Sequence, residues 1–141
     1  MATGFKLVTD AGNTEFRTYT ISSQAYTIGD LVDVSRTAGT VTPSTSSSTT
    51  YTIRGVAMQT VTSAATTLLI ALATPAQKWS VDATNATNVT HNGQRMVLTD
   101  KATVNNTGTD STSTAAVFEQ FGTVSATRLI GRLLVGSLTT G

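Results

Sequence analysis

Few side chains in this sequence have the chemistry of catalysis or metal binding. The chain holds one histidine, His91, and no cysteine, so disulfides, thiolate metal ligands and a cysteine nucleophile are excluded. His91 lies in NVTHNGQ beside a turn, with no acidic residue within several positions, and we interpret it as a solvated turn residue. The G-x-S-x-G pattern of a serine nucleophile is absent. We therefore expect that the protein is not an enzyme.

Cofactor sites have no better support. Asp30 and Asp33 form a close acidic pair, but on one strand their odd separation places them on opposite faces, which favours a turn and strand-edge role. The glycines are isolated, and neither GxGxxG nor GxxxxGK occurs, so no phosphate-binding loop is indicated. We expect no metal ion and no cofactor.

Charge and hydropathy argue against two classes of partner. The nine basic and eight acidic residues nearly cancel and are scattered singly. Nucleic-acid binding depends largely on clustered lysine and arginine, so we expect no nucleic-acid partner. The longest apolar run, LLIALA, is far shorter than the ~20 residues that a membrane span needs. The N-terminus lacks the features of a signal peptide, so we expect neither export by that route nor a membrane partner.

Composition and patterning favour an all-β fold. Only 12% of the 141 residues are charged, and threonine and serine supply the polar surface instead. Threonine has a branched Cβ that suits a pleated strand, and the short apolar runs are separated by turn residues. The length is that of one domain. We predict a single compact β-sandwich or small β-barrel with long loops rich in serine and threonine.

The strongest strand prediction is RLIGRLLV, residues 128–135. Its alternation places Leu129, Gly131, Leu133 and Val135 on one face and the residues between them on the other, and we expect one face to be buried and the other to be partly wet. TTLLIALA, residues 66–73, is interpreted as a fully covered strand, with a helix as the alternative. Residues 115–122 form a strand or a short helix, and Asn92-Gly93 favours a hairpin turn before the strand at 94–99. The other predicted strands are 4–9, 14–21, 30–35, 51–61, 78–82 and 102–104.

Two hydroxyl-rich stretches, residues 36–50 and 105–114, are predicted to be long surface loops. Loops of this length in a compact domain are usually functional or disordered. They are therefore either mobile and inert or ordered against a neighbouring subunit. Trp79, in PAQKWSVD, either packs in the core or contacts a subunit or ligand.

The order of several segments resembles the small decoration, or cement, proteins of tailed-bacteriophage capsids. These segments are YTIGDLVDVS, RGVAM, TTLLIALATPAQKWSVDATN, GQRMVLTDKATVNNTGTDSTS and the terminal RLIGRLLVG. The resemblance covers residues 25–136 and consists of a rhythm of strands and turns, so no binding residue carries over. It implies a β-rich structural virion protein, often a homotrimer, made in the host cytoplasm. Such a protein binds the outer capsid surface and cements adjacent major capsid protein subunits.

The N-terminal residues 1–23 lie outside this resemblance. We expect them to form an arm that adds a strand to a neighbour or to the capsid, with the body at residues 24–141. Phe5, Leu7, Phe16 and Tyr19 would anchor the arm. The alternative is that the segment is the first hairpin of the fold. Other open functions are a head fibre, tail-tube or baseplate component, and a carbohydrate-binding adhesin module, which the low aromatic content of 6% disfavours.

Overall fold

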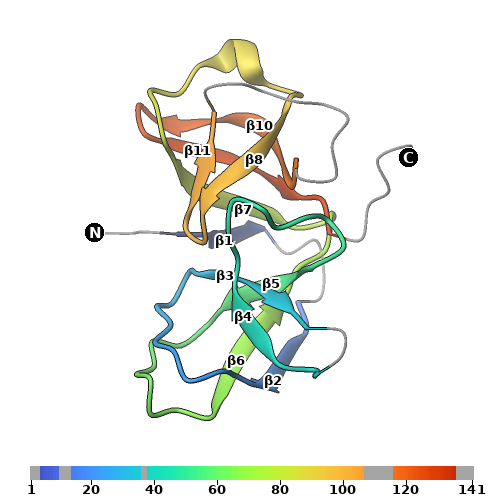
Figure 1. The fold of residues 1–141 in the computed structure, drawn as a ribbon. Coiled ribbons are helices and arrows are strands. Elements are labelled where there is room, and N and C mark those ends of the chain that lie inside the picture. The colour runs from blue at the N-terminus through green and yellow to red at the C-terminus, as the bar shows by residue number, and fades with distance from the viewer. Residues whose placement is uncertain (1–3, 10–13, 36–37, 107–115, 136–141) are drawn as a thin grey trace.

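The computed structural model describes residues 4–9, 14–35, 38–106 and 116–135, and it is almost entirely β-structure. The predicted all-β class is therefore confirmed. The strands form two sheets, which give the molecule two lobes (Figure 1). Most of the predicted loop at 105–114 lies outside the described residues.

Lobe A is a small barrel with one additional strand. Its order is β1 (Lys6–Thr9), β7 (Lys78–Ala83), β11 (Arg128–Leu133), β10 (Phe118–Ser125), β8 (Arg95–Asp100) and β9 (Thr103–Asn105). A parallel pairing of β9 with β7, through Asp82 and Thr103, closes the last five strands into a barrel. Strand β1 pairs with the first half of β7, from Lys78 to Ser80, and lies between the lobes (Figure 1).

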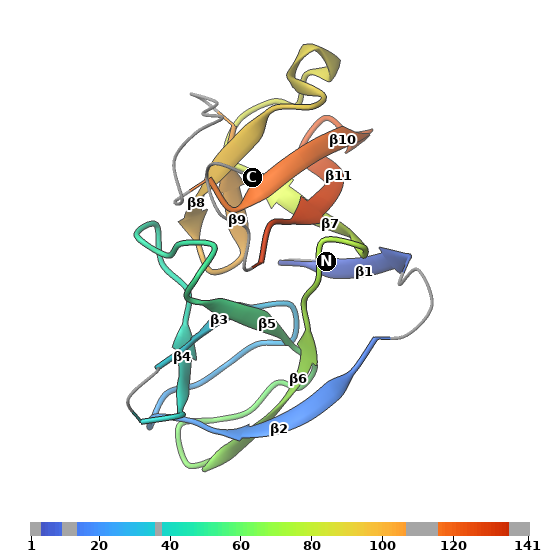
Figure 2. The ribbon, with the colours of Figure 1, turned by 90° about the vertical axis from the view of Figure 1, so that its right-hand side faces the viewer.

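Lobe B is a curled antiparallel sheet. Its order is β2 (Phe16–Thr20), β6 (Thr67–Leu72), β5 (Ile53–Ala57), β3 (Leu31–Val34) and β4 (Val41–Pro43). An isolated parallel bridge between Ile21 and Val41 joins the end of β2 to β4, which brings the two edges of the sheet together. Figure 2 shows β2 and β6 crossing below β3 and β5.

One hydrophobic core extends through both lobes. It combines Leu31, Val56 and Ala71 of lobe B with Trp79 and Phe118 of lobe A, among others. A second core lies inside lobe B. Strand β6 contributes to both, since Ala71 faces the shared core while Leu68 and Ile70 face the second one. This strand is covered on both faces, which explains its continuous apolar run and confirms the strand prediction.

The alternation predicted for the last strand is confirmed over residues 128–133, but it ends there, because Leu134 is buried and Val135 is half-buried. Leu129, Gly131 and Leu133 of β11 are buried, while the residues between them are half-buried. A side chain at Gly131 would overlap the carbonyl oxygen of Glu119 on β10. Glycine is therefore required here because the two strands approach closely.

Two local predictions need correction. The stretch 36–50 is more than a surface loop, because it includes β4 and because Ser44 and Ser48 donate hydrogen bonds to the Asp33 carboxylate. Of the two interpretations of residues 115–122, the strand is the one that forms, as β10 (Phe118–Ser125). Gly93 has a φ of +86°, as an Asn-Gly turn suggests, but a 3-10 helix, η1 (Val89–His91), precedes it and β8 pairs with β9 and β10. No hairpin forms at this turn within the described residues.

Candidate functional site

The five residues expected to contact a partner do not form one surface. Strand β1 brings Leu7 opposite Trp79 of β7, and the Phe5 ring makes an edge contact with Phe118 at a centroid distance of 6.2 Å. Phe5 is 2% exposed and Trp79 is fully buried, so both are core residues instead of contacts with a neighbour. Leu7 is half-buried against the same core.

Phe16 and Tyr19 lie apart from the other three residues, on β2 of lobe B. Their odd separation places them on opposite faces of the strand. Tyr19 packs against the core of lobe B, whereas Phe16 is 53% exposed. Phe16 is thus the most accessible of the five expected contact residues.

The N-terminal strand connects the two lobes of its own chain. The Gly4 carbonyl accepts a hydrogen bond from Nη2 of Arg128 in lobe A, at 2.9 Å. The Phe5 backbone nitrogen donates to the carbonyl of Gly29 in lobe B, at 2.8 Å. Strands β1 and β2 belong to different sheets and do not pair with each other, so they do not form the hairpin considered above. Within this chain β1 completes lobe A.

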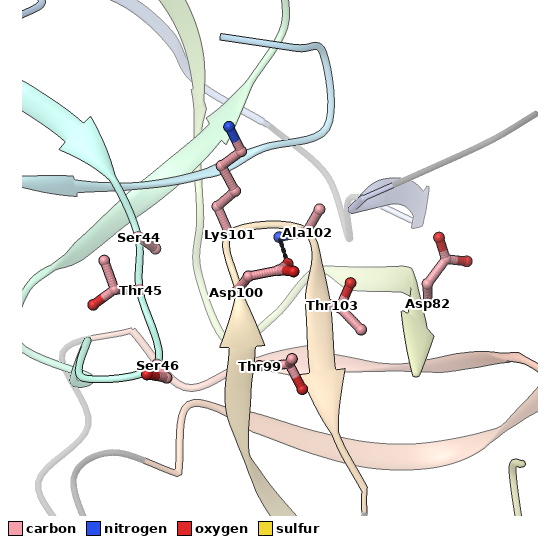
Figure 3. A pocket seen from close by; sticks show the side chains of 9 residues that line it. All are labelled: Ser44, Thr45, Ser46, Asp82, Thr99, Asp100, Lys101, Ala102 and Thr103. Atoms are coloured by element: carbon pink, nitrogen blue, oxygen red, sulfur yellow. Dashed lines mark hydrogen bonds between the residues drawn. The ribbon is translucent and has the colours of Figure 1, made fainter. Parts of the chain in front are cut away.

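A groove lies between the lobes, where β8 turns into β9. Its volume is about 500 Å³. Figure 3 shows Ser44, Thr45 and Ser46 of lobe B facing this turn. The other side chains that line it are Asp82, Thr99, Asp100, Lys101, Ala102 and Thr103.

The charged groups of this inter-lobe groove have partners within the chain. Asp82 accepts a hydrogen bond from Arg128 at 2.8 Å, and Lys101 forms an ion pair with Asp30 at 3.4 Å. Asp100 accepts a hydrogen bond from the backbone nitrogen of Ala102. None of the nine lining residues is histidine or aromatic, so they supply neither a histidine base nor a stacking platform for a sugar. Serine and threonine are the commonest residues in its lining.

The polar residues considered for catalysis have structural roles. Asp30 accepts a hydrogen bond from the Thr27 backbone nitrogen, which fits the predicted turn role, whereas Asp33 lies within the inner strand β3 and binds two serine hydroxyls. His91 is half-buried at the end of η1, less solvated than expected, and its Nδ1 atom has no hydrogen-bond partner. Its predicted position beside a turn is confirmed.

Exposed apolar side chains occur on both lobes, and sequence reasoning missed most of them. Lobe A exposes Val8, Val89, Phe121 and Val124, and lobe B exposes Phe16, Ile28 and Tyr51. Val124, 57% exposed, lies on the part of β10 beyond the predicted strand end at residue 122. Residues 123–125, Thr-Val-Ser, alternate between polar and apolar side chains, and this alternation could have extended the predicted strand to residue 125.

Exposed arginine and glutamate form a close pair on β2. Nε of Arg17 donates to Glu15 at 2.6 Å, and this hydrogen bond is the main cause that raises the pKa of the Arg17 guanidinium. Such exposed pairs contribute little to stability.

Comparisons with known proteins found no match. No protein-family model matches the sequence, and no curated protein matches it either.

Within the described residues, no three histidine, aspartate or glutamate side chains gather in a way that would hold a metal ion. The described part of the chain also contains no helix with the length and hydropathy for crossing a bilayer.

Proposed function

We propose that this protein is a structural, non-enzymatic component of a phage virion. It binds the outer surface of the capsid and cements adjacent major capsid protein subunits. The observation that carries this proposal is a two-lobed β-body with one shared core and exposed apolar side chains on both lobes. The resemblance of residues 25–136 to capsid decoration proteins supports the same role.

A cement protein needs two attachment surfaces held at a fixed separation. The shared core fixes lobe A relative to lobe B, and Gly4 and Phe5, just before β1, form hydrogen bonds with lobe A and lobe B respectively. Phe16 on lobe B and Val124 on lobe A represent the two surfaces, with 53% and 57% of their area exposed. A rigid body of this kind resists separation of the subunits to which its two lobes bind.

Multivalency strengthens this attachment. When one lobe has bound, the other meets its site at a high effective concentration, so weak contacts combine into tight binding. A homotrimer, the state favoured by the resemblance, multiplies the contacts again and matches a threefold position on the capsid. The chain's low charge and hydroxyl-rich surface allow close approach to a protein surface without strong electrostatic repulsion.

The proposal is tested by sedimentation with undecorated capsids of the phage that encodes the protein. The variants Phe16→Asp and Val124→Asp each place a charge on one lobe at an exposed position, so both should fold normally. Each is expected to weaken capsid binding by about a hundredfold or more, because avidity is lost with either attachment. Thr123→Asp, an exposed neighbour without a large apolar side chain, is the matched control.

Wild-type affinity in both apolar-to-charged variants, while the wild-type protein sediments with capsids, would contradict two-lobe attachment. If the wild-type protein also stays in the supernatant, the cement role itself fails. A tail component then becomes the better hypothesis.

A further inference from the structure

A second cavity lies in lobe B, away from the inter-lobe groove. Its volume is about 540 Å³. The end of β3 contributes Val34 and Ser35, the turn that follows contributes Gly39, and Tyr51 and Arg54 complete the described lining. Arg54 belongs to β5, so a strand of the sheet fixes the position of its backbone.

Arg54 has no acceptor in the described part of the chain. Its Nε atom is buried and makes no hydrogen bond, and none of the ion pairs among the described residues includes it. Arg128 and Arg132 differ, because each donates to a carboxylate at 2.8 Å. A buried donor without a partner is unusual in folded proteins, so Arg54 calls for an acceptor that is not among the described residues.

The charge of the described lining residues indicates the charge that this acceptor carries. Arg54 is the only charged side chain among the described lining residues, so these residues favour a negatively charged group. The planar guanidinium presents paired donors that match the two oxygens of a carboxylate. The Tyr51 ring, 41% exposed, and the Val34 side chain provide apolar walls for the carbon atoms next to such a group.

We propose that this cavity binds a carboxylate group, with Arg54 as the counter-ion that recognises it. This inference does not depend on the capsid role. The carboxylate belongs either to a small organic acid or to an aspartate or glutamate side chain of a protein partner. The chemistry is the same in both cases, so the experiment distinguishes the sources.

The test is an NMR titration of the isotope-labelled full-length protein. Sodium acetate is compared with sodium chloride at equal ionic strength, and N-acetyl-Gly-Glu-Gly-amide is compared with its glutamine analogue. We expect saturable shifts of the Ser35, Gly39 and Tyr51 amides and of the Arg54 Nε–H signal with acetate and with the glutamate peptide only. Tighter binding of the peptide than of acetate assigns the site to a protein carboxylate, and the reverse assigns it to a small acid.

Matched variants locate the binding group. Arg54→Gln should abolish the saturable shifts, whereas Arg17→Gln removes the same charge from an exposed, already paired arginine and should leave them unchanged. Arg54→Lys keeps the charge without the planar fork and should weaken binding by about tenfold, which tests the site even if the glutamine variant does not fold. Shifts that follow ionic strength alone, or that persist in either Arg54 variant at wild-type affinity, would overturn the proposal.

Discussion

Replacement of Phe5 by alanine tests whether the N-terminal strand belongs to the core. The Phe5 side chain is 2% exposed and contacts Phe118 in the core shared by both lobes. Truncating a buried phenylalanine to alanine costs about 3–5 kcal/mol, because burial is lost and a cavity remains. Since a domain is typically stable by only about 5–15 kcal/mol, this loss should be easy to measure.

Urea unfolding followed by tryptophan fluorescence is the assay. Trp79 is the only tryptophan and is fully buried. It lies on β7 opposite Leu7 of β1, two residues after Phe5, so its emission reports directly on this region. Phe16→Ala is the matched control, because its exposed ring should contribute within about 0.5 kcal/mol. A free energy of unfolding for Phe5→Ala within that same margin of wild type would refute the core assignment and restore the free-arm hypothesis.

Three further substitutions test the packing and the polar contacts. Gly131→Ala should destabilise the protein severely, because the added Cβ would overlap the Glu119 carbonyl oxygen. Gly122→Ala, on the paired strand β10, is the control, because its Cβ would make only an ordinary 3.5 Å contact with the Ile130 side chain. Thermal unfolding compares the two variants. Asp33→Ala should cost about 1–3 kcal/mol in urea unfolding, because two serine hydroxyls lose their acceptor, and an unchanged midpoint would contradict this. Arg128→Met removes the donor to the Gly4 carbonyl, so amide exchange in β1 should accelerate while that in β6 stays constant.

Local sequence patterns were sufficient to predict most strands. The alternation of residues 128–133 indicates a strand with one covered face, and the unbroken apolar run at 68–73 indicates a strand that is covered on both faces. Strand β4 was missed because its three residues, Val-Thr-Pro, lie in a hydroxyl-rich stretch and end in proline. The position of β4 depends on contacts with residues distant in the sequence, including the hydrogen bond that the Tyr26 hydroxyl donates to the Val41 carbonyl.

The division into two lobes and the position of the candidate sites were not predictable in this way. Barrel closure requires the parallel pairing of β9 with β7, which joins segments about twenty residues apart and leaves no periodic signal. Phe5 was assigned to a surface arm because nothing local distinguishes a core residue near the N-terminus from an anchor. Arg54 was seen only as one of nine scattered basic residues, since sequence does not show which arginines find a carboxylate.

The most direct test of the central claim is the number of copies bound per capsid at saturation. Undecorated capsids are mixed with increasing amounts of the wild-type protein and sedimented, and light scattering gives the oligomeric state of the free protein. The proposed cement role predicts a stable oligomer and a sharp plateau at a ratio set by the symmetry sites of the capsid. Protein that stays in the supernatant, or binding that rises without a plateau, would contradict it.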